Sequence, residues 1–183
     1  LAKDEVRQAA ARMGLAVAGK PDSQEICFVP DGDYAGFLER QAPALATAGA
    51  IVNQQGETVG AHGGVHRFTI GQRKGLGLSA GVPLYVVNID AARQEVMVGP
   101  RGALDRTDLT ASRVTWVAGE APTGAIAAQV QIRHRHVAAA ARIRALDDGR
   151  AAVEFAAPQS AITPGQAAVF YDGDEVLGGG WID

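Results

Sequence analysis

The spacing of apolar residues along the chain is helical near the N-terminus and becomes strand-like after residue 48. Over residues 3–13 the apolar positions recur at helical spacing opposite charged positions, which predicts an amphipathic helix that ends at Gly14. A second apolar stripe predicts a helix over residues 33–41, with Asp31 as its N-cap and Pro43 as its stop.

From residue 48 onward, short apolar runs alternate with glycine and turn residues, which is typical of β-structure. A central group of strands is predicted at residues 50–52, 58–59, 65–70, 83–89 and 95–98, and a boundary between domains near residues 104–107. Six further strands are predicted at residues 109–117, 125–132, 138–146, 150–155, 167–171 and 175–178. Six strands joined by short turns favour a small antiparallel barrel. The predicted fold class is therefore mainly β, with a short helical N-terminal part, a small central β domain and a six-stranded antiparallel β-barrel.

The composition is that of an ordinary globular protein, with 47% hydrophobic and 20% charged residues among 183. One cysteine cannot form an internal disulfide, and no apolar run approaches the ~20 residues of a membrane span. These features predict a reduced, cytoplasmic setting without membrane attachment.

Basic residues gather in two acid-free tracts although the net charge is -3. Residues 58–89 contain no Asp or Glu but carry His62, His66, Arg67, Arg73 and Lys74. Residues 121–146 likewise carry Arg133, His134, Arg135, His136, Arg142 and Arg144. Such an uneven distribution is compatible with a polyanionic partner.

The cysteine, Cys27, lies in the stretch KPDSQEICF, on a predicted short strand over residues 26–29 or its exit loop. A thiol with an ordinary pKa near ~8.5 needs an activating environment before it becomes a nucleophile. Cys27 between two apolar neighbours fits a buried small hydrophobic residue as well. The polar run over residues 22–25 and Lys20 favour the reactive interpretation, although any histidine base has to come from elsewhere in the fold.

Two other patterns have two interpretations each. The run RHRH at residues 133–136, placed on a strand, puts its arginines on one face and its histidines on the other. This run is either a phosphate contact or a solvent-exposed strand edge. The loop GQRKGLG lacks the spacing of a nucleotide phosphate loop, and is either a polyanion contact or a mobile surface loop. His62 and His66 lack the companions of a zinc site, so no metal is expected. Gly165 and the run Gly178–Gly180 are predicted turn residues with positive φ.

Several long stretches, in the same order, resemble the tRNA-specific 2-thiouridylase family. They are KPDSQEICF, GETVGAHGG, FTIGQRKGLGL, IRHRH and AITPGQAAVFYDGDEVLGGG. The resemblance implies a transferase that thiolates the wobble uridine of certain tRNAs: ATP adenylates the 2-position oxygen, and persulfide sulfur displaces AMP. It also implies that the barrel is similar to the second domain of translation elongation factors.

Within this resemblance, Cys27 matches the cysteine that carries the persulfide. Arg133, His134 and Gln166 match tRNA-contact positions, with His134 replacing the usual tyrosine but keeping a ring for stacking. Charge alone adds further expected tRNA contacts at Arg73, Lys74 and Arg135.

The resemblance further implies that the chain is the C-terminal half of the enzyme. Residues 1–30 would be the tail of a nucleotide-binding domain, residues 31–105 a central β-rich domain, and residues 106–183 the barrel. ATP would bind only through the N-terminal domain, so this chain alone is expected neither to bind ATP nor to thiolate tRNA. The expected partners are tRNA and a sulfur-relay or cysteine desulfurase protein, and a monomer is expected. The alternatives are a stand-alone RNA-binding β-barrel module without catalysis, and a β-rich domain pair with no activity.

Overall fold

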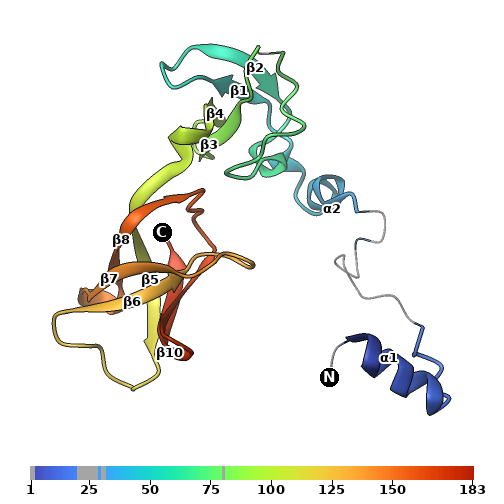
Figure 1. Ribbon diagram of the computed structural model, residues 1–183. Helices are drawn as coiled ribbons and strands as arrows, with labels where there is room; N and C mark the ends of the chain where they lie inside the picture. The colour runs from blue at the N-terminus through green and yellow to red at the C-terminus, as the bar shows by residue number, and fades with distance from the viewer. Residues whose placement is uncertain (1–2, 20–28, 30–31, 80) are drawn as a thin grey trace. The chain divides into compact units, whose positions relative to one another are not determined.

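The computed structural model describes residues 3–19, 29, 32–79 and 81–183 (Figure 1). The chain divides into two compact units, residues 1–44 and 45–183. Cys27 and most of the predicted strand over residues 26–29 lie outside the described residues. None of the described helices is long and apolar enough to cross a membrane.

The first unit contains the two predicted helices, α1 (Lys3–Arg12) and α2 (Tyr34–Gln41). A short 3-10 turn, η1 (Pro43–Leu45), follows α2. The prediction of the N-cap was wrong: Asp33, not Asp31, caps α2, and its Oδ1 accepts a hydrogen bond of 2.9 Å from the Gly36 amide. Asp33 is the residue directly before the first helical turn, where a carboxylate can reach the unpaired amides.

A four-stranded sheet opens the second unit, with strands in the order β2-β1-β4-β3 (Figure 1). The strands are β1 (Gly49–Val52), β2 (Thr58–His62), β3 (Tyr85–Asp90) and β4 (Glu95–Gly99). β1 and β4 are parallel, and the other neighbouring pairs are antiparallel. Its core consists of buried aliphatic side chains: Ile51, Leu76, Val86, Val96 and Val98.

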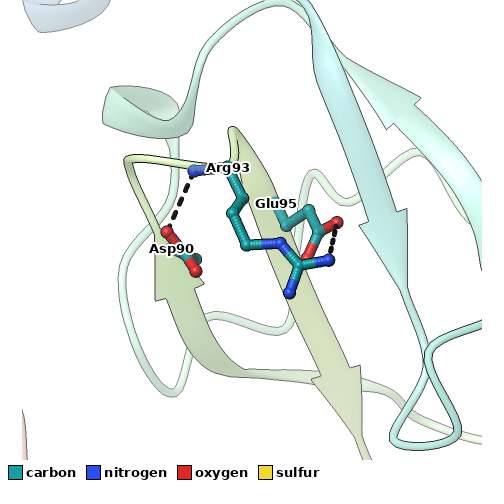
Figure 2. Close-up of polar contacts among 3 residues, drawn as sticks. All are labelled: Asp90, Arg93 and Glu95. Carbon is teal, nitrogen blue, oxygen red and sulfur yellow. Dashed lines mark hydrogen bonds and ion pairs between the residues drawn. The ribbon is translucent and has the colours of Figure 1, made fainter.

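The predicted turn between β3 and β4 is held by its own side chains (Figure 2). The Arg93 amide donates to Asp90 Oδ1 at 3.0 Å, and Arg93 Nη2 lies 3.1 Å from Glu95 Oε1. The ion pair is largely exposed, so it is worth about 1 kcal/mol at most and mainly fixes the turn.

The prediction of a strand over residues 65–70 was wrong. Val65–Arg67 forms a 3-10 turn, η2, entered through Gly64 at φ 155°. Val65 and Phe68 have the residue types of a strand, but they pack against the sheet core from a connecting segment. Apolar pattern alone therefore identified burial correctly and the backbone conformation incorrectly.

The remaining six strands close into an antiparallel barrel, which confirms the prediction (Figure 1). After the turn η3 (Arg101–Leu104) come β5 (Asp105–Trp116), β6 (Ala125–Gln131), β7 (Ala139–Ala145), η4 (Asp147–Gly149), β8 (Ala151–Ser160), β9 (Ala167–Asp172) and β10 (Glu175–Ile182). Their order around the barrel is β10-β5-β8-β7-β6-β9. Inward side chains such as Phe170, Ile143 and Val130 are completely buried.

The prediction for Gly178–Gly180 was also wrong, because all three lie inside β10 and none has a positive φ. A Cβ on Gly180 would stand 2.6 Å from the Ser112 carbonyl oxygen, and one on Gly179 equally close to the Ala168 oxygen. These glycines allow neighbouring strands to approach closely. Gly165, at φ 81°, is a turn glycine as predicted.

Candidate nucleic-acid interface

A surface cavity of about 550 Å³ opens on the barrel where β6 ends and β9 begins. It is lined by Gln131, Arg133, His134, Gln166, Ala167 and Val169. Three of the seven residues predicted as sites, Arg133, His134 and Gln166, thus meet in one place although the last is far from the others in sequence. They meet because β6 and β9 are neighbours in the barrel, with Gln131 opposite Val169.

Residues 132–138 form the connection from β6 to β7, so the prediction that RHRH lies on a strand with alternating faces was wrong. The backbone turns here, with the His136 amide donating to the Arg133 carbonyl at 3.1 Å. Arg135 adopts a positive φ of 61°, which lies outside the extended region of a regular strand. As a result Arg135 is exposed and does not line the cavity, whereas Arg133 and His134 do.

Arg133 is held from the neighbouring strand β8. Its Nη1 donates a 2.9 Å hydrogen bond to the Ser160 carbonyl oxygen, and the side chain is half-buried. A guanidinium has five N–H donors, so one such bond fixes its direction and leaves donors for a ligand. A planar donor fork of this kind matches phosphate oxygens in pairs.

His136 anchors the other end of the same turn. Its Nε2 lies 3.1 Å from Gln159 Oε1, and Gln159 Nε2 donates to the Ala157 carbonyl at 2.8 Å. That second bond makes the Gln159 oxygen the acceptor, so His136 Nε2 carries the proton and its buried Nδ1 has no hydrogen-bond partner in the described part of the chain. Burial lowers the pKa of His136 below 6.5 and nearby Arg133 lowers it further, while the bond to Gln159 opposes them.

Gln166 is placed by a tight turn that joins the loop to β10. The Ile182 amide donates to the Gln166 carbonyl at 2.8 Å, and the Gly165 amide donates to the Ile182 carbonyl at 2.8 Å. Within the described residues, the buried side-chain Oε1 of Gln166 has no hydrogen-bond partner. A buried amide oxygen without a partner costs free energy, which a donor on a bound ligand would recover.

The glycine-rich loop after η2 lines a second cavity of about 440 Å³. Its backbone is fixed: Gln72 Oε1 accepts from the Thr69 amide, Gln72 Nε2 donates to the Lys74 carbonyl, and Leu76 is buried. Arg73 lines this cavity, while Lys74 is exposed and does not. The loop therefore places the positive charge of Arg73 at the cavity and that of Lys74 in solvent.

His62 of the first basic tract has structural contacts. His62 is buried, its Nδ1 accepts from the Gly64 amide at 3.1 Å, and its ring meets Phe68 edge-on at 5.3 Å. Across the described ranges, no three His, Cys, Asp or Glu side chains gather as metal ligands.

Sequence reasoning missed Gln131, Ser160 and Gln159. Gln131 lines the cavity and accepts a 3.4 Å hydrogen bond from the Tyr171 hydroxyl. Its polar side chain stands between buried Val130 and Ile132, a signal that marks it as outward-facing at the end of a strand. Ser160 and Gln159 carry no such signal, because their role depends on β8 lying near the turn.

Three family models match successive parts of the chain. Residues 106–182 match an aminomethyltransferase beta-barrel domain, residues 35–100 a tRNA methyl transferase PRC-barrel domain, and residues 1–31 a tRNA methyl transferase HUP domain. Together with the closed barrel, these matches assign the chain to the class of tRNA-modification proteins that carry this barrel.

Curated relatives identify the family to which the chain belongs within that class. The chain is 51% identical over its full length to a tRNA-specific 2-thiouridylase from Geotalea uraniireducens, of which it covers 48%. It is 53% identical to the protein of the same name from Solibacter usitatus, covering all of this chain and 52% of the relative. In Magnetococcus marinus the identity is 50%, over 98% of this chain and 50% of the relative.

The chain belongs to the tRNA-specific 2-thiouridylase family, as its motifs predicted. It spans about half the length of the curated relatives that it matches.

Proposed function

We propose that this chain works within a tRNA 2-thiolation enzyme, where it binds tRNA and carries the transferred sulfur. The observation that supports the activity most directly is the identity of about half of all positions, across the whole chain, to proteins named tRNA-specific 2-thiouridylases. The proposal keeps the three-part division into residues 1–30, 31–105 and 106–183, which the ranges of the family models support.

In the proposed reaction, ATP adenylates the 2-position oxygen of the wobble uridine with release of pyrophosphate. The terminal sulfur of a persulfide on Cys27 then attacks the activated carbon, and AMP leaves with the oxygen, so that the uridine is joined to Cys27 through an S–S bond. A second thiol of the longer enzyme would attack Cys27 Sγ, and the S–S electron pair would leave with the 2-thiouridine sulfur. The disulfide formed between that thiol and Cys27 would be reduced by an external thiol. The match of residues 1–31 to a HUP domain supports ATP use by the longer enzyme. The persulfide sulfur would come from a sulfur-relay or cysteine desulfurase protein in the cytoplasm.

The cavity lined by Arg133, His134 and Gln166 is the proposed tRNA contact on the barrel. A fixed guanidinium suits a phosphate, an exposed imidazole ring suits a base, and the buried Gln166 oxygen suits a base or ribose donor. Arg73, Lys74 and Arg135 would add charge that strengthens binding without reading sequence.

Replacing Cys27 tests the catalytic part of the proposal. In the enzyme that contains this chain, Cys27→Ser should abolish 2-thiouridine formation and leave the affinity for tRNA unchanged, because serine keeps the size but cannot hold a persulfide. The measurement is 2-thiouridine in digested tRNA beside a filter-binding assay. Normal thiolation by this variant would refute the role of Cys27.

Replacing Arg133 and Arg135 together tests the RNA-binding part. The double alanine variant should weaken tRNA binding and reduce the slope of log affinity against log salt by about one for each lost phosphate contact. Arg106→Ala is the matched control, since it removes an exposed arginine of the same barrel that is already paired with Asp108. Equal salt slopes for the double variant and the wild type would contradict the proposal.

A further inference from the structure

An exposed tryptophan lies on the barrel surface beside the cavity. Trp181 is 46% exposed near the end of β10, and it pairs across the ladder with Ala167, which lines the cavity. Directly paired residues of antiparallel strands project to the same face, so the indole and the cavity share one outer surface. The other tryptophan, Trp116, instead packs against Phe170 with ring centroids 5.6 Å apart.

A continuous row of paired positions runs from the cavity across β10, where it passes two residues from this tryptophan. Gln131 on β6 pairs with Val169 on β9, Val169 with Gly179 on β10, and Gly179 with Thr115 on β5. None of these four residues carries a negative charge. Because Gly179 has no side chain, no side chain rises from the surface at that position next to the indole. Asp183 follows the end of β10, is exposed and places a carboxylate two residues from Trp181.

Arg113 is held over the indole at a conformational cost. Its Cζ lies 5.7 Å from the Trp181 ring centroid, and its backbone has a φ of 49°. The register between β5 and β10 shifts at this point, so Arg113 sits in a bulge. Bulges redirect side chains, and strained non-glycine residues of this kind cluster at functional sites. Arg113 forms no ion pair with any carboxylate among the described residues that would otherwise account for its position.

We infer that Arg113 and Trp181 form a second RNA-binding element next to the cavity, in which the indole stacks on an unpaired nucleobase and the guanidinium binds its phosphate. The inference rests on the proposed tRNA binding and extends it to residues that no motif marks. Aromatic rings on an exposed sheet face are the usual platform for single-stranded bases, and arginine adds charge beside them. The Arg113 guanidinium beside the indole and the continuity of this face with the cavity favour RNA over a second protein chain.

Alanine substitution tests the stacking role in the whole 183-residue chain. Trp181→Ala should weaken binding of fluorescently labelled tRNA by about fivefold to a hundredfold, and Trp181→Phe should lose clearly less because it keeps a ring. Val176→Ala is the control, because Val176 lies on the same strand with a similar exposed fraction of 41% but near its other end. Unchanged tRNA affinity in Trp181→Ala would overturn the inference.

Intrinsic fluorescence distinguishes stacking on bases from general attraction to polyanions. Binding of tRNA or oligouridylate should quench the wild-type emission, and Trp181→Phe should remove that quenching since the remaining Trp116 packs against the core. Heparin, a polyanion without bases, should bind without quenching. Equal quenching by heparin, or tRNA quenching that persists in Trp181→Phe, would refute base stacking.

Arg113→Gly separates a functional from a structural role. Glycine adopts a φ of 49° without strain, so the melting temperature should stay the same or rise. The tRNA affinity should fall, and the salt slope should decrease by about one. A lower melting temperature with unchanged tRNA affinity would show that the pair only stabilises the fold.

The outcomes also separate this inference from the function on which it rests. If Arg133 and Arg135 matter for tRNA binding while Trp181 and Arg113 do not, the inference fails and the proposed interface stands. If the wild-type chain binds no tRNA, both fail. If Trp181→Ala changes the sedimentation of the chain alone and leaves tRNA affinity intact, a second copy covers this surface and the inference is overturned.

Discussion

Gln159→Leu should loosen the turn that carries Arg133 and His134 while the barrel stays folded. Gln159 is the link between β8 and this turn: it accepts from His136 Nε2 at 3.1 Å and donates to the Ala157 carbonyl at 2.8 Å. Leucine has a similar size and can do neither. The substitution leaves the bond from Arg133 to Ser160 as the remaining side-chain link from the turn to β8 in the described residues.

The expected loss of stability follows from these two bonds. Each intramolecular hydrogen bond contributes about 0.5–1.5 kcal/mol, and the His136 ring would be left with two unsatisfied nitrogens in a half-buried site. Water reaches part of this site, so the sum should lie near ~1–2 kcal/mol. Urea unfolding at neutral pH measures it, and a change below ~0.5 kcal/mol would refute the anchoring role.

The pH dependence gives the same prediction a second readout. Because burial lowers the pKa of His136 in the folded state, its neutral form contributes stability that is present above the unfolded pKa of about 6.5 and is lost as pH falls through the folded value. Gln159→Glu places a carboxylate at the ring and should raise the pKa of His136. In this variant the charged form of His136 contributes stability that is present below the unfolded pKa of about 6.5 and is lost as pH rises through the folded pKa.

Unfolding free energies of wild type and Gln159→Glu, compared across about pH 5 to 8, test this reversal. The difference between the two proteins cancels the titration of the other histidines. We expect the variant to gain stability relative to wild type as the pH decreases. Parallel pH profiles of the two unfolding free energies would show that the pKa of His136 does not depend on the side chain at position 159.

Three further predictions follow from the barrel and the cavity. Phe170→Ala should cost about 3–5 kcal/mol in urea unfolding, since the side chain is completely buried, whereas a cost below ~1 kcal/mol would contradict the core assignment. Gly180→Ala should lower the melting temperature, because its Cβ would meet the Ser112 carbonyl oxygen at 2.6 Å; an unchanged value would refute the close strand approach. Arg133→Lys should weaken tRNA binding despite keeping the charge, because an ammonium cannot hold Ser160 and present a fork together; full affinity in filter binding would refute this.

The sequence was sufficient for the parts of the fold that depend on local pattern. The alternation of apolar and polar residues, together with the turn residues, predicted all six barrel strands. In a small barrel one face of each strand is buried and the other is exposed to solvent. The same signals failed at residues 65–70, where Val65 and Phe68 are apolar for packing but not extended. They also failed at Gly178–Gly180, since close approach between strands depends on partners far away in sequence.

The candidate site shows the same limit. Motif resemblance identified Arg133, His134 and Gln166, and the structure brings them to one cavity. It could not reveal that Arg135 turns away, because the strand-like alternation of RHRH ends in a turn. The roles of Gln159 and Arg113 depend on strand register, which a single sequence does not specify.

Strand register also explains why the proposed interface depends on an intact barrel. The contact between β6 and β9 that closes the barrel consists of three residue pairs, ending with Gln131 opposite Val169. Arg133 follows one strand and Gln166 precedes the other, so this last pair fixes the distance between them. A slip of β9 by one residue would turn Val169 inward and Phe170 outward. The buried Phe170 prevents that slip, and a side chain of the core thereby keeps the two halves of the cavity together.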